Sequence, residues 1–224
     1  MSKHAIEHLE LKNLTVIRSD LPLFKPVDIS LKPSQAIQIS GTNGAGKTSL
    51  LRCICGLSQR YEGSINWAGQ SIENCKPLLY QELLYIGHSL GLKPKLTVEQ
   101  NLSFYQQLRS NYHRQNIIDA LEQLEIGAYF DEYVGNLSAG QKRRVALARI
   151  LVEPVNFWVL DEPMVALDVN GQAWLEKACN SHLAEGGMIL LTSHQRITGI
   201  HGLSEYRLQE PSLTSELFKM QESA

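Results

Sequence analysis

The sequence predicts an α/β fold with a mainly parallel core sheet, an antiparallel β section and an inserted α-helical subdomain. First, short apolar runs alternate with amphipathic stretches, as in a parallel sheet with crossover helices. Second, the apolar run 36–40 leads directly into a glycine-rich loop and an apolar helix. Third, residues 88 to about 150 show helical spacing without a convincing strand, which indicates a helical insertion.

Length and composition fit one compact domain. The chain has 224 residues, of which 43% are hydrophobic and 20% charged, with a formal net charge of −2. Nucleic acid is not expected as a partner, because a binder of DNA or RNA should carry a basic stripe, and Lys142–Arg144 is too short for one. We expect a single domain, 1–224, with 1–87 and 151–224 as its core and 88–150 as the helical subdomain.

The individual elements follow from local patterns. The run 6–14, with leucines at 9, 11 and 14, is expected to start the antiparallel section, to which 64–67 also belongs. Continuous apolar runs predict buried parallel strands at 36–40, 83–87 and 156–160, and a further strand, 190–194, is expected to end in His194. Apolar residues at helical spacing predict helices; these are 98–108, 115–124 and 141–151.

The glycine-rich loop has the G-x-x-x-x-G-K-[ST] pattern of a phosphate-binding loop. Its residues are Gly41, Thr42, Asn43, Gly44, Ala45, Gly46, Lys47 and Thr48. The glycines let backbone N–H groups point inward, and the following helix directs its positive end to the same place. Lys47 can neutralise β and γ phosphates, and the Thr48 hydroxyl can bind Mg²⁺. The alternative is a plain glycine-rich turn, which the strand before and the helix after it argue against.

Two carboxylates follow the apolar strand 156–160. Asp161, at the strand end, is expected to hold Mg²⁺ through water, and Glu162 to act as the base for an attacking water. The alternative is a buried strand that ends in a charged turn. Because the pair follows a phosphate-binding loop in the chain, we favour the catalytic interpretation.

A helix with a basic first turn follows the segment Leu137, Ser138, Ala139, Gly140 and Gln141. Ser138 stands at an N-cap position, and the inward stripe is expected to comprise Val145, Ala148, Ile150 and Leu151. Basic residues in a first turn oppose the helix dipole, so we expect an anion nearby. The alternative is an ordinary capped helix with a solvated basic face.

The ordered set of segments resembles the ATP-binding cassette (ABC) family. LSAGQ at 137–141 is similar to the family's signature, Ala166-Leu167-Asp168 to its D-loop, and Leu190–His194 to its switch strand. The resemblance implies Mg²⁺-dependent ATP hydrolysis with His194 at the γ phosphate. It also implies a head-to-tail homodimer, in which Ser138 and the Gly140 N–H of one copy contact the ATP of the other.

The residue at the family's glutamine-loop position is His88. Imidazole can still donate to a phosphate oxygen, but it adds a group that titrates near neutral pH. The run 85–97 is also similar to the ATPase subunits of the haem exporters of cytochrome c maturation. That narrower resemblance implies integral-membrane partner subunits, with a coupling helix received around 88–97. At the position where the family often stacks an aromatic ring on adenine, Arg18 is the candidate and Phe24 is expected in the core.

The expected location is the cytoplasmic face of a bacterial inner membrane. Met1–Glu10 lacks the apolar segment of a secretory signal, and no apolar run in the sequence approaches the eighteen residues of a membrane-spanning helix. The four cysteines are expected as reduced, mostly buried thiols rather than a metal or haem site. Two other functions stay open: an exporter ATPase for another cargo, and an ATP-dependent dimerisation switch with weak catalysis. A repair or translation ATPase would need a coiled-coil insertion or a second cassette, and the sequence has neither.

Overall fold

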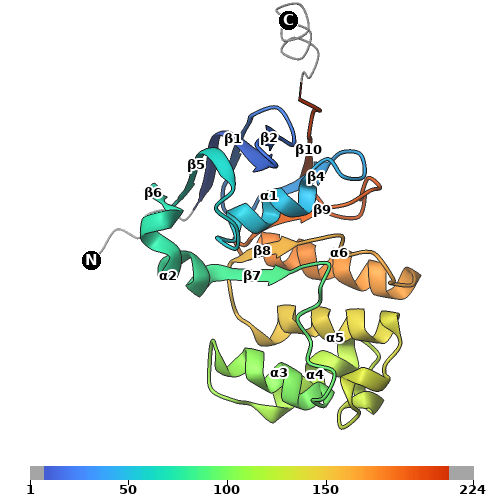
Figure 1. Ribbon diagram of the computed structural model, residues 1–224. Coiled ribbons are helices and arrows are strands. Elements are labelled where there is room, and N and C mark those ends of the chain that lie inside the picture. The colour runs from blue at the N-terminus through green and yellow to red at the C-terminus, as the bar shows by residue number, and fades with distance from the viewer. Residues whose placement is uncertain (1–7, 212–224) are drawn as a thin grey trace, which may run out of the picture.

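The computed structural model describes residues 8–211 and contains two sheets and the helices that cover them (Figure 1). The strands are β1 (Leu9–Arg18), β2 (Leu21–Pro22), β3 (Val27–Leu31), β4 (Ala36–Ser40), β5 (Tyr61–Trp67), β6 (Gln70–Ser71), β7 (Leu83–Ile86), β8 (Phe157–Leu160), β9 (Met188–Thr192) and β10 (Leu203–Arg207). The α-helices are α1 (Lys47–Ile54), α2 (Ile72–Glu82), α3 (Val98–Gln107), α4 (Arg114–Gln123), α5 (Ala139–Val152) and α6 (Val169–Ala184), with 3₁₀ turns at Gly127–Tyr129 and Val134–Asn136.

The central sheet is parallel, as predicted, with strand order β10-β4-β9-β8-β7. The strands β4, β7, β8 and β9 are largely buried on both faces, toward which successive side chains alternate, whereas no residue of the edge strand β10 is fully buried. Phe157 and Val159 of β8 pack toward α1, α2 and the antiparallel sheet. Trp158 and Leu160 pack on the other face, against the apolar sides of α3 to α6. The sheet is thus the layer between two hydrophobic cores.

The antiparallel sheet contains both segments that the sequence assigned to it. β1 pairs antiparallel with β3 and with β5, and Leu9, Leu11 and Leu14 are buried on its inner side. The predicted beginning of this section at residue 6 lies outside the described residues. Phe24 is also buried, as expected, against the cradle of the phosphate-binding loop.

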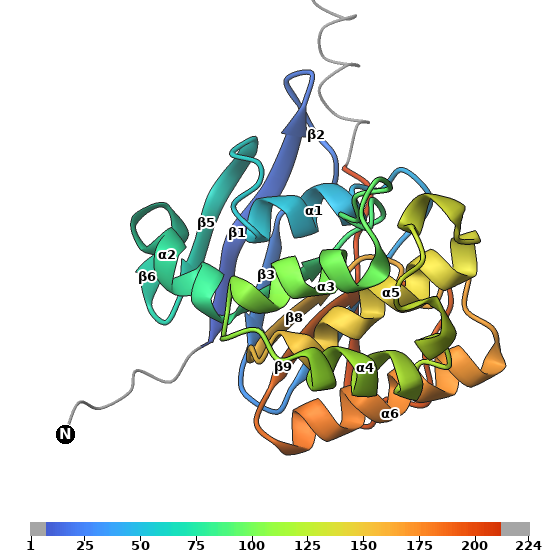
Figure 2. The same ribbon diagram turned by 90° about the horizontal axis from the view of Figure 1, so that it is seen from below.

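The helices α3, α4 and α5 gather at one end of the molecule, away from the antiparallel sheet (Figure 1), and Figure 2 views the molecule from that end. α3 and α5 each begin with a reciprocal capping box, formed by Thr97 with Gln100 and by Ser138 with Gln141. The inward stripe of α5 was predicted correctly for Val145, Ala148 and Ile150. Leu151 is a correction, because its side chain is 37% exposed. Within residues 8–211, no helix combines the length and the apolar character needed to cross a bilayer.

Phe157 is expected to be a major contributor to stability. Its ring is fully buried and stacks on Trp67 at a centroid distance of 5.4 Å, which joins the two sheets. Truncation to alanine should lower the free energy of unfolding by about 3–5 kcal/mol, through lost burial and the cavity left behind. Urea denaturation would measure this, with Leu21→Ala as the control, since Leu21 is 56% exposed. A loss below about 1 kcal/mol for Phe157→Ala would contradict this account of the core.

Candidate active site

The candidate site lies where three parallel strands end. β4, β8 and β9 are neighbours in the sheet, so the loops after them meet at its carboxyl edge. A pocket of about 350 Å³ opens there. Its lining residues are Arg18, Leu23, Asn43, Gly44, Ala45, Gly46, Lys47, Thr48, Ser49, His88, Glu162 and His194. The structure therefore brings together residues from the loop, both candidate catalytic side chains, the glutamine-loop position and the candidate base-stacking arginine.

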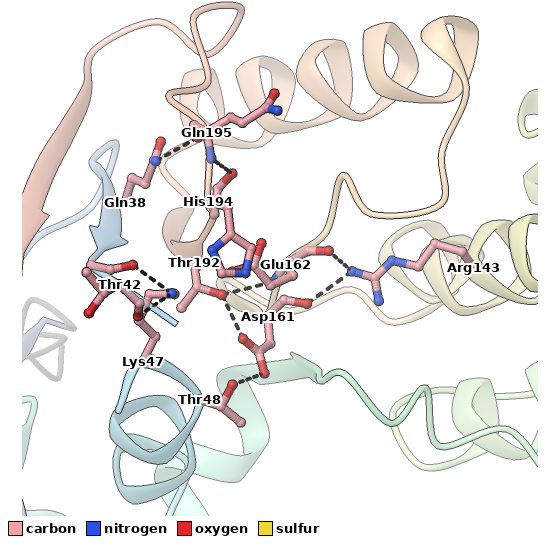
Figure 3. Close-up of polar contacts among 12 residues, drawn as sticks. Gln38, Thr42, Lys47, Thr48, Arg143, Asp161, Glu162, Thr192, His194 and Gln195 are labelled. Atoms are coloured by element: carbon pink, nitrogen blue, oxygen red, sulfur yellow. Dashed lines mark hydrogen bonds and ion pairs between the residues drawn. The ribbon is translucent and has the colours of Figure 1, made fainter. Parts of the chain in front are cut away.

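The loop 41–48 curls around the Lys47 ammonium group. Lys47 Nζ donates to the carbonyl oxygens of Gly41 at 2.9 Å and Thr42 at 3.3 Å, and the side chain is 7% exposed (Figure 3). Gly44 and Gly46 adopt φ values of 84° and 94°, which favour glycine. A Cβ on Gly46 would also approach the Phe24 ring at 3.0 Å. α1 begins at Lys47, so the N–H groups of its first turn face the pocket.

A chain of hydroxyl and carboxylate groups links α1, β8 and β9. Thr48 Oγ1 donates to Asp161 Oδ2 at 2.8 Å, and Thr192 Oγ1 donates to Asp161 Oδ1 at 2.7 Å. The Glu162 N–H in turn donates to Thr192 Oγ1 at 2.9 Å. Asp161 is 1% exposed, so its carboxylate is held by both hydroxyls in a nearly dry position. This places two oxygen groups suited to Mg²⁺ side by side next to the loop.

Glu162 faces the pocket from a left-handed backbone conformation. Its φ is 50°, and its side chain is 15% exposed. Oε1 is buried without a hydrogen-bond partner, although His194 Nε2 lies 3.4 Å away. That separation allows an ion pair when the imidazole is protonated, but the two groups are not aligned as a hydrogen bond. A buried carboxylate oxygen with no donor is suited to accept a proton from a group that enters the pocket.

Two residues that support the site, Gln38 and Thr192, were given no separate role in the sequence analysis. The Gln38 amide holds the segment after His194, since it donates to the Gln195 carbonyl at 3.0 Å and its Oε1 accepts from the Ile197 N–H at 3.3 Å. Thr192 was read only as part of the switch strand. The contacts of Gln38 join positions more than one hundred and fifty residues apart in the chain. No local sequence pattern therefore predicts them.

The basic first turn of α5 has anionic partners nearby, as expected, and they are carboxylates of the chain itself. Arg143 donates to main-chain carbonyls of the turn after β8. Arg144 forms two hydrogen bonds with the Asp168 carboxylate at 2.7 and 2.8 Å and one with Glu125. Lys142 Nζ donates to the Gly135 carbonyl at 3.2 Å. A bound anion is therefore not needed to explain these charges.

The signature segment 137–141 is not part of the pocket. Leu137 is buried, whereas Ser138 and Ala139 are exposed. Ser138 Oγ accepts from the Gln141 N–H at 3.2 Å, so the serine caps α5 at the surface. Among the described residues, none of 137–141 lines the pocket. Asp168 caps α6 and is tied to α5 through Arg144, and the hydrogen bonds from the Gly171 N–H and Arg144 lower its pKa.

A larger cavity, of about 720 Å³, lies elsewhere, between α5, β8 and α6. Trp158 and His182 stack there at a centroid distance of 3.7 Å, and burial lowers the pKa of His182. No predicted site residue lines it. The four cysteines are all buried and unpaired, and burial raises the pKa of the Cys179 thiol to about 12.

A parallel sheet with a phosphate-binding loop at its carboxyl edge, and a carboxylate pair after a nearby strand, is the arrangement of a phosphate-loop nucleotide-binding protein. Residues 24–165 match the ABC transporter family, and the chain belongs to that family. It is therefore an ABC-type ATPase.

Within the ABC transporter family, the chain is similar to two CcmA proteins. The chain is 44% identical over 188 residues to the cytochrome c biogenesis ATP-binding export protein CcmA of Vibrio vulnificus, covering 84% of this chain and 92% of that protein. It is 38% identical over 205 residues to CcmA of Sodalis glossinidius, covering 92% and 95%. Among solved structures, a putative ABC transporter ATP-binding protein from Pyrococcus furiosus superimposes with a TM-score of 0.78, at 27% identity, and covers 90% of this chain and 97% of that one.

Proposed function

We propose that this chain is the ATP-hydrolysing subunit of a membrane exporter that handles haem during cytochrome c biogenesis. The main observation in favour of ATP hydrolysis is that Lys47, Glu162 and His194 line one pocket. The hydrogen-bonded pair Thr48 and Asp161 lies beside them. The similarity to CcmA proteins supports the biogenesis role. An exporter ATPase for another cargo is the alternative, because cargo contacts lie on the membrane subunit.

In this proposal the loop 41–48 binds the triphosphate. Its inward N–H groups and the first turn of α1 surround the phosphates, while Lys47 exchanges its carbonyl partners for phosphate oxygens. Arg18, which lines the same pocket, stacks on the base through its guanidinium plane. Because no Phe, Tyr or Trp ring lines this pocket among the described residues, base discrimination is expected to be weak.

Thr48 and Asp161 would hold Mg²⁺. Their oxygens form a hard donor set, and the 2.8 Å hydrogen bond between them supports the proposal that both contact one ion. When bound, the ion would neutralise charge on the phosphate oxygens. Thr192 keeps the Asp161 carboxylate oriented through its own hydrogen bond at 2.7 Å.

Glu162 is proposed as the base for the attacking water, and His194 as the γ-phosphate contact. The unpartnered Oε1 supports the first role, since it can accept the water proton without breaking an existing hydrogen bond. The exposed imidazole, 3.4 Å from that oxygen, supports the second. Phosphoryl transfer depends mainly on positioning and charge stabilisation, which these groups supply. A dimerisation switch with weak catalysis is disfavoured because both residues are present.

The complete site is proposed to need a second copy. Ser138 is exposed and stands outside the pocket, at the start of α5 in the proposed helical subdomain 88–150. In a head-to-tail dimer, Ser138 and the Gly140 N–H of each copy would contact the nucleotide of the other, as the family resemblance implies. ATP would then hold the copies together, and hydrolysis would release them. The region 88–97 would contact integral-membrane partner subunits at the cytoplasmic face of the inner membrane.

His88 provides a test of the glutamine-loop assignment. His88→Ala should lower the ATPase rate by roughly ten-fold, because the pocket loses a polar group that can contact phosphate or water. His88→Gln should retain most activity, since glutamine is the residue that the family usually has at this position. Steady-state phosphate release by both variants would measure this. Equal rates for the alanine variant and the parent would remove His88 from the site.

Recovery of the complex from membranes tests the cargo assignment. Tagged chain, extracted in mild detergent, should bring the cytochrome c maturation membrane proteins with it. The Lys47→Ala variant serves as a control for nucleotide dependence. Recovery of a different permease instead would contradict the haem assignment while leaving the ATPase chemistry intact.

A further inference from the structure

Arg143 is a buried cation whose guanidinium group binds main-chain oxygens of the candidate active site. The residue is 5% exposed and lies on α5, five residues after Ser138. Its Nη2 donates to the carbonyls of Asp161, at 3.0 Å, and Glu162 (Figure 3). Its Nε donates to the Pro163 carbonyl at 3.2 Å. Its Nη1 lies 3.5 Å from the Gly87 carbonyl at the end of β7. One side chain thus holds three consecutive carbonyls and the residue before His88.

The turn that Arg143 holds is the one in which Glu162 has a left-handed backbone. A φ of 50° is unfavourable for a residue with a side chain, and it persists only where the surroundings enforce it. Two contacts do so from opposite sides. Thr192 Oγ1 accepts from the Glu162 N–H, and Arg143 binds the Glu162 carbonyl. This conformation brings the Glu162 carboxylate to the pocket wall.

An arginine suits this position better than other donors. Its planar fork can bind several oxygens in fixed directions, whereas a lysine ammonium is a compact point charge on a flexible stem. Burial lowers the pKa of Arg143, and the carboxylates of Asp161 and Glu162 oppose that shift. The charge is therefore matched by the same two residues whose main chain it binds.

We propose that Arg143 is a positioning residue for ATP hydrolysis, which fixes the main chain of residues 161–163 so that the Glu162 carboxylate faces the nucleotide pocket. The proposal rests on the role proposed above for Glu162 as the base. Because Arg143 and Ser138 share the first turns of α5, a shift of this helix against the sheet would also shift the turn that carries Glu162.

The test compares Arg143→Gln and Arg143→Lys with a matched control, Arg109→Gln. Arg109 also binds main-chain carbonyls, of Tyr80 and of Leu83 (2.7 Å), but next to the opposite end of β7. Each variant would be purified in the intact membrane complex and characterised for kcat, KM and affinity for ATP. Arg143→Gln should lower kcat roughly ten- to hundred-fold through misplacement of Glu162. Its ATP affinity should stay within about three-fold of the parent, because Lys47 and the loop are untouched.

The control should keep the parental kcat, and Arg143→Lys should fall between the parent and the glutamine variant. Thermal unfolding of every variant would separate lost activity from lost protein. If Arg143→Gln does not accumulate in folded form, the lysine variant decides alone. A kcat equal to that of the parent in whichever Arg143 variant folds would overturn the proposal.

A double variant distinguishes positioning from general structural damage. If Arg143 acts through Glu162, adding Arg143→Gln to Glu162→Gln should not lower the residual single-turnover rate further. Multiplicative losses would mean that Arg143 acts elsewhere, and would overturn the proposal. A Glu162→Gln variant with the parental rate would overturn the base assignment as well. A slow Glu162→Gln variant beside a fully active Arg143→Gln variant would overturn only the positioning role.

Discussion

A Glu162→Gln variant is expected to bind ATP as the parent does and to hydrolyse it at least about a hundred-fold more slowly, which is the size of effect that general base catalysis supplies. Glutamine keeps the shape of the side chain, so the backbone contacts to Thr192 and Arg143 remain. What it removes is the proton acceptor at Oε1, the buried oxygen that has no hydrogen-bond partner. Stopped at the ATP-bound stage, the variant should accumulate as a dimer.

Single-turnover hydrolysis, with size-exclusion chromatography in the presence of Mg²⁺ and ATP, would measure both effects. Glu122→Gln is a suitable control, since Glu122 is an exposed carboxylate on α4 and does not line the nucleotide pocket. If Glu162→Gln hydrolysed ATP at the parental rate, another group would have to be the base.

A Lys47→Ala variant is expected to lose most of its affinity for ATP. The ammonium group sits inside the loop and contacts the carbonyls of Gly41 and Thr42, so its removal takes away a phosphate partner and loosens the cradle. The loss of one charge-assisted contact corresponds to roughly a ten- to hundred-fold weaker affinity. Isothermal titration with a slowly hydrolysed ATP analogue would measure it.

Lys12→Ala provides the matched control, because the Lys12 side chain is 61% exposed on the antiparallel sheet and pairs only with Glu10 among the described ion pairs. It should leave the affinity unchanged. Parental affinity in Lys47→Ala would remove the phosphate-binding role assigned to that lysine. Folding of both variants would be checked by thermal unfolding.

Most of the fold was accessible from the sequence because its signals are local. The strands β4, β8 and β9 are short apolar runs that end where polar, functional residues begin, and a parallel sheet brings such ends to one edge. The N-cap of α5 was also predicted from the sequence, at Ser138, and the structure adds that Gln141 completes a capping box with it.

The residues that hold the site in place could not be predicted from local sequence patterns. The Arg143 contacts depend on how α5 packs against the end of β8, so a basic first turn was taken as a sign of an anion or a solvated face. Leu151 was assigned to the buried stripe because helical spacing alone does not fix where a stripe ends. Gln38 and Thr192 act through contacts that only the assembled sheet creates.

The central claim is that the signature segment of one copy covers the nucleotide held by another. Within the described residues, the pocket lacks any contribution from 137–141, and Ser138 is exposed. A triphosphate bound by one chain would therefore keep an open side, which a second chain could close.

Thiol cross-linking between two differently tagged copies tests this arrangement most directly. One copy would carry Ser138→Cys and the other Asn43→Cys, both with Glu162→Gln; the native cysteines are buried and are not expected to react. With Mg²⁺ and ATP, a short bifunctional thiol reagent should give a covalent product that contains both tags, and the product should disappear without nucleotide. A product formed equally well without ATP, or no product containing both tags when Mg²⁺ and ATP are present, would contradict the proposed shared site.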